Sequence, residues 1–193
     1  MVFNRALRLM LINNGIILFV AGLLTPLYAI YVEEIGGKLF DASIAASVLP
    51  FAAAVTVLIS GYVADKTDED VMIMVVGSVF ITLGFFLYLF THSMTLVIIN
   101  QALIGIGEAI YAPAFDSVYS LHLDKRKAGR QWGAWEAMRY ITLSASALIG
   151  GIIVVKTGFQ TLFVIMTLAS LFNLVYLFLY GREIINSHKI NKH

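Results

Sequence analysis

The sequence predicts an all-α membrane protein with six transmembrane helices. Hydrophobic residues make up 60% of the chain and charged residues 13%, whereas soluble domains contain about 45–50% and about 25%. Short segments rich in charge and glycine separate long apolar runs. Each run approaches the length of about 20 residues that a helix needs to cross the hydrocarbon core. We therefore expect the chain to lie in a lipid bilayer and to pass through it several times.

The first apolar run spans residues 9–32 and follows a short polar head, residues 1–8. A cleaved signal peptide has a shorter apolar core and a small-residue cleavage site, so this run is expected to remain as a helix. The second run spans residues 42–64, after a polar turn that contains Gly36 and Gly37. It includes Pro50, which membrane helices tolerate where neighbouring groups satisfy the freed carbonyl.

The stretch from residue 71 to residue 107 contains no Asp, Glu, Lys or Arg. As one helix it would be nearly twice as long as the hydrocarbon core is thick, so it must break, and residues 91–95 are its polar cluster. The expected helices are residues 71–90 and 94–121, then 131–155 and 159–180 after a basic loop. The transmembrane domain thus covers residues 9–181, and residues 182–193 are expected to form a polar tail.

Basic residues concentrate on one side of this predicted topology. They lie in the head, in the loop after residue 64, in the loop of residues 122–130 and in the tail, while Lys38 and Lys156 fall on the other side. Cytoplasmic loops carry the excess of Lys and Arg in membrane proteins. Both termini are therefore expected to be cytoplasmic, in a multi-pass protein of the plasma or inner membrane.

Several function classes are not supported by the composition. The net charge of +1 and the scattered basic residues give no nucleic-acid-binding surface. The chain has no cysteine, and its four histidines are far apart in the sequence, so no metal site is expected. Residues 105–110 resemble the start of a dinucleotide fingerprint, but the third glycine and the preceding strand are missing. No apolar run pairs a nucleophile with a base, so we expect neither an enzyme nor a bound cofactor.

Glu108 is the residue that most needs an explanation. It lies near the centre of the apolar stretch of residues 100–116, where a carboxylate is costly and is usually retained for function. On a helix, Gln101, Gly105 and Glu108 share one face that is small and polar. Because the hydrocarbon disfavours the charged form, Glu108 is expected to take up and release a proton. A buried structural acid is the alternative interpretation.

Other polar residues gather in the first, fourth and fifth predicted helices. Asn14, Thr25 and Tyr28 follow helical spacing in the first helix and are expected to line a wet cavity with Gln101 and Gly105. They could equally form bonds between helices or, for Tyr28, an anchor at the membrane interface.

A cluster of charges is expected near the cytoplasmic mouth of the bundle. Arg139 and Glu136 lie one turn apart in the fifth helix, and Asp116 approaches from the fourth. The rise per residue of an α-helix places all three residues between the cytoplasmic ends of the helices and the depth of Glu108. This cluster could act as a gate or have a purely structural role, and the sequence favours neither interpretation.

The loop between the second and third helices resembles a motif of the major facilitator superfamily. The family's pattern there is Gly-x-x-x-Asp-Arg/Lys-x-Gly-Arg/Lys-Arg/Lys; Gly61, Asp65 and Lys66 match it, and acidic residues replace the rest. In the fourth helix Gly105 and Gly107 fit the family's Arg-x-x-x-Gly-x-Gly pattern, with Gln101 in place of the arginine. The coupling role of that arginine is therefore not carried over.

The resemblance implies that the chain is one six-helix half of such a transporter, of the N-terminal type. Such a half consists of three helices followed by an inverted repeat of the same three. Family members fuse two halves about an axis along the membrane normal. Two copies of this chain inserted the same way could imitate the fused protein. The resemblance thus implies a parallel homodimer that moves a small-molecule substrate by alternating access, with protons coupled through Glu108.

Small residues in the second and fifth helices favour them as the dimer contact, because they let helix backbones approach closely. The third and sixth helices would then be outermost. Two alternatives remain: an accessory half that needs a different partner and does not transport by itself, or a fragment of a twelve-helix transporter.

Overall fold

The computed structural model describes residues 3–64, 66 and 69–190, and within them every regular element is helical. The elements are α1 (Arg5–Leu24), the 3-10 turn η1 (Thr25–Leu27), α2 (Tyr28–Glu34), α3 (Leu39–Ala64), α4 (Asp70–Tyr88), α5 (Met94–Leu121) and α6 (Ala128–Ile190). The prediction of an all-α class is confirmed.

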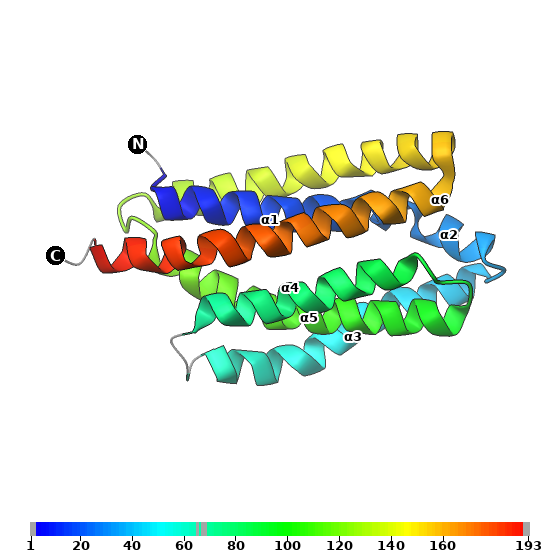
Figure 1. Cartoon of the computed structure of the whole chain (residues 1–193), viewed down its shortest axis with the longest axis horizontal. Helices are drawn as coiled ribbons and strands as arrows, with labels where there is room; N and C mark the ends of the chain where they lie inside the picture. The colour runs from blue at the N-terminus through cyan, green and yellow to red at the C-terminus, as the bar shows by residue number, and fades with distance from the viewer. Residues whose placement is uncertain (1–2, 65, 67–68, 191–193) are drawn as a thin grey trace.

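Five helical stretches are long and apolar enough to cross a membrane, namely Arg5–Glu34, Leu39–Val63, Asp70–Tyr88, Met94–Leu121 and Ala128–Gly181. The last is far longer than one crossing requires. Its chain reverses at Gly158, whose φ of 80° and ψ of 174° are not helical, and Figure 1 shows the two arms of α6 running back beside each other. The two arms correspond to the predicted fifth and sixth helices; six separate crossings stay a prediction.

The first predicted helix differs from the structure because it is not continuous. Pro26 has no N–H to donate, and the chain passes through η1 between α1 and α2 at this point. At the other end, α1 begins four residues earlier than the predicted span. The side chain of Asn4 accepts a hydrogen bond from the Leu7 N–H at 2.8 Å, which caps the helix.

The polar tail predicted for residues 182–193 is helical as far as Ile190 in the structure. Glu183 forms an ion pair with Arg5, and Ile184 is buried. The ion pair joins this part of α6 to the start of α1. Residues 191–193 lie outside the described part of the chain.

The helices form two layers (Figure 1). One layer contains α1 and both arms of α6, and the other contains α3, α4 and α5, which fits the pairs in contact: α1 with α6, α4 with α5, α3 with α5, and α4 with α6. The start of α1 and the end of α6 lie at the same end of the bundle (Figure 1).

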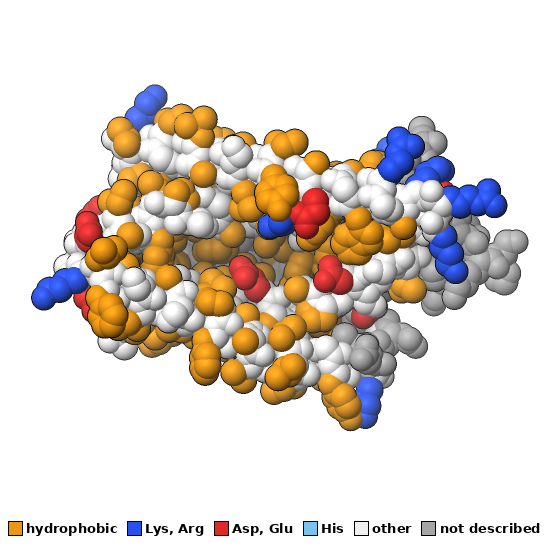
Figure 2. All heavy atoms as spheres, turned by 180° about the vertical axis from the view of Figure 1, so that it is seen from behind, with side chains coloured by type: hydrophobic (Ala, Val, Ile, Leu, Met, Phe, Trp, Pro, Cys, Tyr) orange, Lys and Arg blue, Asp and Glu red, His pale blue; other side chains and the backbone are white. Residues whose placement is uncertain are grey.

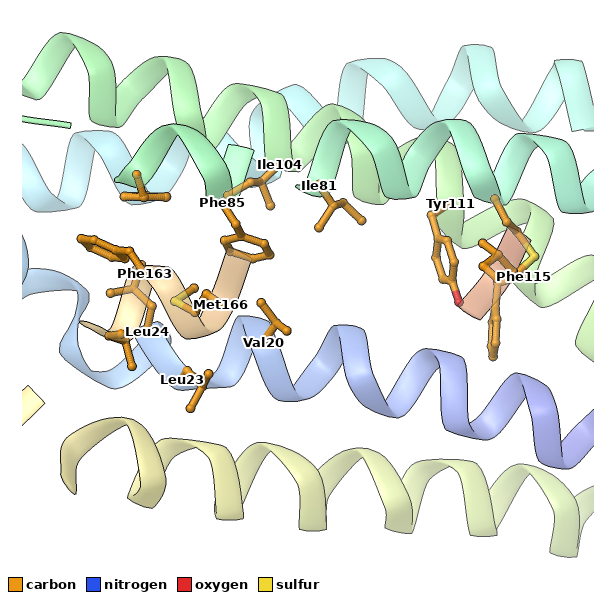
Figure 3. Close-up of a cluster of buried hydrophobic side chains, with 14 of the residues drawn as sticks. Val20, Leu23, Leu24, Ile81, Phe85, Ile104, Tyr111, Phe115, Phe163 and Met166 are labelled. Atoms are coloured by element: carbon orange, nitrogen blue, oxygen red, sulfur yellow. The ribbon is translucent and has the colours of Figure 1, made fainter. Parts of the chain in front are cut away.

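The core lies between the two layers. In Figure 3, Val20 and Met166 point from one layer toward Ile81 and Phe85 of the other, and Phe115 lies at one end of the row. Phe115, Met166 and Ile81 are at most 3% exposed. Packing between the layers therefore sets how each helix is rotated, and with it which polar side chains meet.

Helices α4 and α5 cross without side chains between their backbones. A Cβ placed on Gly107 would lie 2.7 Å from the carbonyl oxygen of Gly77, and one on Gly77 would lie 2.7 Å from that of Gly107. Real Cβ atoms do not approach a carbonyl this closely, so both positions require glycine. This close crossing holds α5, which carries Glu108, at a defined height against α4.

Candidate functional site

A cavity of about 240 Å³ lies between α1, η1, α2, α3, α4 and α5. Its walls are Ala21, Leu24, Thr25, Tyr28, Ala46, Leu49, Pro50, Phe85, Tyr88, Gln101, Ile104 and Glu108. Figure 2 shows one face of the molecule hollowed between two ridges, with acidic side chains beside the hollow. Among the predicted cavity residues, the structure thus brings Thr25, Tyr28 and Gln101 together with Glu108.

Glu108 contributes a carboxyl group to this wall. No hydrogen bond or ion pair links Glu108 to another described residue. Its cavity neighbours are mostly apolar, and none of the described residues lining the cavity is basic. A carboxyl group at membrane depth without a counter-charge is costly in its ionised form, so this position suits a proton or a cationic ligand.

Two buried hydroxyl groups also lack partners in this cavity. The hydroxyls of Tyr28 and Tyr88 make no hydrogen bond to a described residue, although Tyr88 is only 1% exposed. The Tyr28 hydroxyl faces the side chains of Gln101 and Tyr88 without the geometry of a hydrogen bond to either. Buried polar atoms are nearly always satisfied in folded proteins, so these two point to a partner that the chain itself does not supply.

Asn14 and Thr25 use their polar groups within the protein. The Asn14 side-chain oxygen accepts a hydrogen bond from the Trp135 ring nitrogen at 3.1 Å, and Asn14 does not line the cavity. The Thr25 hydroxyl donates to the Ala21 carbonyl at 2.9 Å, one turn back on its own helix. Asn14 therefore joins α1 to α6, and the Thr25 hydroxyl bonds back to α1.

Gly105 belongs to a helix contact in the structure. A Cβ there would collide with the Leu49 carbonyl of α3, so Gly105 lets α5 approach α3 closely. Leu49 and Pro50 themselves line the cavity. Gly105 thus shapes the cavity from behind one of its walls.

The charge cluster is joined only in part. Arg139 Nη2 lies 2.8 Å from Glu136 Oε2, and the Arg139 guanidinium lies 4.5 Å from the centre of the Tyr140 ring. No ion pair or hydrogen bond links Asp116 to the rest of the described chain. Asp116 is on α5 in the other layer, so the structure assembles a pair rather than a group of three.

The loop motif is described in part. Gly61 has open space around the position of a Cβ, so no helix of the described chain packs closely against it. The Lys66 ammonium lies 4.2 Å from the centre of the Tyr62 ring and donates to its hydroxyl. Asp65 lies outside the described residues.

Sequence reasoning missed a buried polar chain that ties the two layers together. The Tyr111 hydroxyl donates to the Asn13 side-chain oxygen at 2.6 Å, and the Asn13 amide donates to the Asn173 oxygen at 2.9 Å. Asn13 and Asn173 are at most 2% exposed. An asparagine inside an otherwise apolar run was the available signal, since membrane helices often use such residues to bind one another.

Tyr88 was also missed as a cavity residue. It lies in a run without any ionisable residue, which predicted an outermost helix, but it is fully buried between the layers. Within the described ranges, no group of three His, Asp or Glu side chains could hold a metal ion. The site is therefore a pocket with a carboxyl group, an amide and phenol groups.

Two comparisons with known proteins bear on this site. The sequence profile described as Major Facilitator Superfamily matches residues 10–192. The multidrug resistance protein MdtG of Escherichia fergusonii is 22% identical over 169 residues, which is 86% of this chain and 41% of MdtG. The chain thus spans about two fifths of the length of this curated relative.

Proposed function

The chain belongs to the Major Facilitator Superfamily, and on that premise we propose that it is one half of a secondary active transporter, working as a parallel homodimer that moves a small solute by alternating access. Transporters of this family are built from two related halves about an axis along the membrane normal. A pair of identical chains would supply the second half. In this proposal, six crossings place both termini in the cytoplasm, in keeping with the distribution of basic residues.

The observation that carries the proposal is the cavity that contains Glu108. One layer of a single chain forms most of its walls, and α1 of the other layer completes them. A second copy facing it would enclose roughly twice the volume, within the range of about 300–1,000 Å³ that ligand pockets usually have. The two Glu108 carboxyl groups would then face one shared central space.

Proton coupling follows from the position of Glu108 in that space. A carboxyl group without a basic partner is easily protonated in a low-dielectric wall and gives up the proton when water reaches it. Alternating access exposes the cavity to each side of the membrane in turn. Glu108 can therefore be loaded from one side and unloaded to the other, which is the requirement for coupling.

Glu136, Arg139 and Asp116 have a supporting role in this proposal. Arg139 and Glu136 form a pair on the first arm of α6, whereas Asp116 lies apart from them on α5. A partner chain or a second conformation would be needed to bring Asp116 into contact with this pair. This group would serve as a gate at the mouth of the cavity. Gly61 near the end of α3, and Asp65 and Lys66 between α3 and α4, would lie on the cytoplasmic side.

A flux assay on the full chain tests the transport proposal. Purified protein is reconstituted into liposomes with an imposed pH gradient, and labelled tetraphenylphosphonium, benzoate and lactose are offered separately. We expect at least one of them to be concentrated in a manner that a protonophore abolishes. Movement of all three at the rate seen in protein-free liposomes would contradict the proposal.

A second candidate is supported by the comparison of lengths. Because the chain covers 41% of MdtG, it also fits a half that pairs with a different half, as an accessory subunit or as a part of a longer transporter. The mass of the assembly extracted with its surrounding lipid separates the candidates: two copies of this chain support the homodimer, and one copy with another polypeptide supports the alternative.

A further inference from the structure

The chemistry of the cavity wall indicates what kind of solute it accepts. None of the described residues that line the cavity is Lys, Arg or His, whereas Glu108 brings a carboxyl group. The Arg139 guanidinium is bound to Glu136 on α6, and neither residue lines the cavity. The ionised form of Glu108 would repel an anionic ligand, and a cationic ligand would compensate its charge where a neutral ligand would not.

The remaining polar groups of the wall can all accept hydrogen bonds. Phenol oxygens, the amide oxygen of Gln101 and a carboxylate each accept from a protonated amine. The hydroxyls of Tyr28 and Tyr88 have no hydrogen-bond partner within the described part of the chain, and leaving such groups unsatisfied when buried is costly. An ammonium group with several N–H donors would satisfy them together.

The aromatic rings add a second attraction for a cation. Tyr28, Phe85 and Tyr88 lie on the wall with Glu108, and the face of an aromatic ring attracts a positive charge within about 6 Å of its centre. Leu24, Ile104 and the small alanines form the rest of the surface. The cavity thus combines an apolar lining with several groups that accept hydrogen bonds.

We propose that the cavity binds a small organic cation with an apolar body and a protonated amine, which donates hydrogen bonds to Glu108 and to the hydroxyls of Tyr28 and Tyr88. This inference rests on the proposed transport function, because it names the substrate class of the same cavity. Binding itself requires no transport, so the two proposals can fail separately.

The test uses four ligands that share a phenethyl body. Phenethylamine carries a charged N–H donor, its N,N,N-trimethyl analogue carries the charge without N–H, 2-phenylethanol is neutral, and 3-phenylpropionate is an anion. Isothermal titration calorimetry on the full chain in lipid nanodiscs measures the affinity of each. We expect phenethylamine to bind tightest, the trimethyl analogue next, and the alcohol at least about tenfold more weakly than phenethylamine, since a hydrogen bond to a charged group is lost.

Two variants locate the binding groups. Glu108→Gln keeps the shape of the side chain and removes its charge. It should lower the affinity for both cations by about tenfold or more. Tyr88→Phe removes a hydroxyl that has no partner in the chain, so the fold should be retained. The Tyr88→Phe variant should have a lower affinity for phenethylamine but an unchanged affinity for the trimethyl analogue, which has no N–H to donate. Tyr180→Phe, a half-exposed ring outside the cavity, and Glu33→Gln are the matched controls.

Several results would overturn the inference: equal affinity for the alcohol and the amine, tighter binding of the anion, no binding of any of the four ligands, or unchanged cation binding in a folded Glu108→Gln protein. Amine binding without flux in liposomes would support the cation site and count against transport. Concentration of benzoate or lactose by a protein that does not bind amines would support transport and refute this substrate class.

Discussion

At the scale of single residues, Glu108 distinguishes a transporter driven by protons from one that only equilibrates its solute. Glu108→Gln has nearly the same shape but no titratable proton. In liposomes it should abolish pH-driven accumulation while downhill exchange and the folded assembly persist, because only the coupled step needs the proton. The readout is the ratio of internal to external solute across a series of imposed pH gradients.

Glu33→Gln is the control for this measurement. Glu33 is an exposed acid near the end of α2 and does not line the cavity, so accumulation should be that of the unaltered protein. If the Glu108→Gln protein still concentrates its solute with the same pH dependence, Glu108 is a structural acid and the coupling proposal fails.

The pair of Arg139 and Glu136 allows a second test at this scale. Removing one member leaves the other charge without its partner in a poorly solvated place, which costs more than removing both. Arg139→Ala should therefore unfold at a lower temperature than the double Arg139→Ala, Glu136→Ala protein. Because the side chains are 31% and 42% exposed in the single chain, solvent screens the pair and the difference is expected to be small.

Thermal unfolding in lipid nanodiscs measures this difference, with Arg130→Ala at the start of α6 as the control. Equal defects in the single and double variants would mean that the two side chains do not stabilise each other in the membrane. Asp116 would then be the next partner to examine, even though the structure gives it no ion pair to Arg139.

At the scale of helices, the crossing of α4 and α5 depends on glycine. A Cβ on Gly107 would meet the Gly77 carbonyl and the Ile81 nitrogen, and backbone atoms cannot turn away as a side chain can. Gly107→Ala should therefore lower the free energy of unfolding by about 1–3 kcal/mol, which is the usual cost of overpacking. Denaturation in mixed micelles, followed by the loss of helical circular dichroism, measures it.

Gly61→Ala provides the matched comparison because the same change falls in open space. Alanine is favoured over glycine inside a helix by about 0.5–1 kcal/mol, so this variant should be neutral or slightly more stable. A similar loss of stability in both variants would indicate that the α4–α5 crossing is not the cause.

At the scale of the whole molecule, α3 is the least covered helix. Only 11% of its most apolar window is buried, compared with 44% for α4 and for α5, and Phe51 and Leu58 are 73% and 78% exposed. In a membrane, either lipid or protein can cover apolar side chains. Exposure in the single chain therefore does not by itself identify a protein–protein interface. The small residues of α3 and of the first arm of α6 are the reason to place the partner chain there.

Cysteine cross-linking tests this placement directly, since the chain contains no cysteine of its own. Cysteines introduced singly at Ala53 of α3 or at Ala147 of α6 should link two copies in membranes. Leu83 of α4 and Phe172 on the second arm of α6 are exposed controls that should remain unlinked. Links through the control sites alone would place the dimer contact on the other face.

The sequence by itself predicted which segments are helical and that they lie in a membrane. The reason is physical: a backbone in hydrocarbon must satisfy its own hydrogen bonds, so apolar runs of a certain length become helices. Glu108 stood out for the same reason, because a carboxyl group there is costly wherever the helix packs. The family resemblance on Gly61, Asp65, Lys66, Gly105 and Gly107 agrees with the family to which the whole chain belongs.

Only the tertiary structure decided which polar groups meet. Tyr88 and Tyr28 share a cavity with Glu108, Asn14 bonds to Trp135, and Asn13 joins Tyr111 and Asn173, although these partners are far apart in the sequence. Each of these contacts depends on how a helix is rotated about its axis and how far it is shifted along it. Both are set by packing between the layers and by close helix crossings such as that of Gly77 with Gly107. Periodicity along one helix carries no information on the helix that faces it.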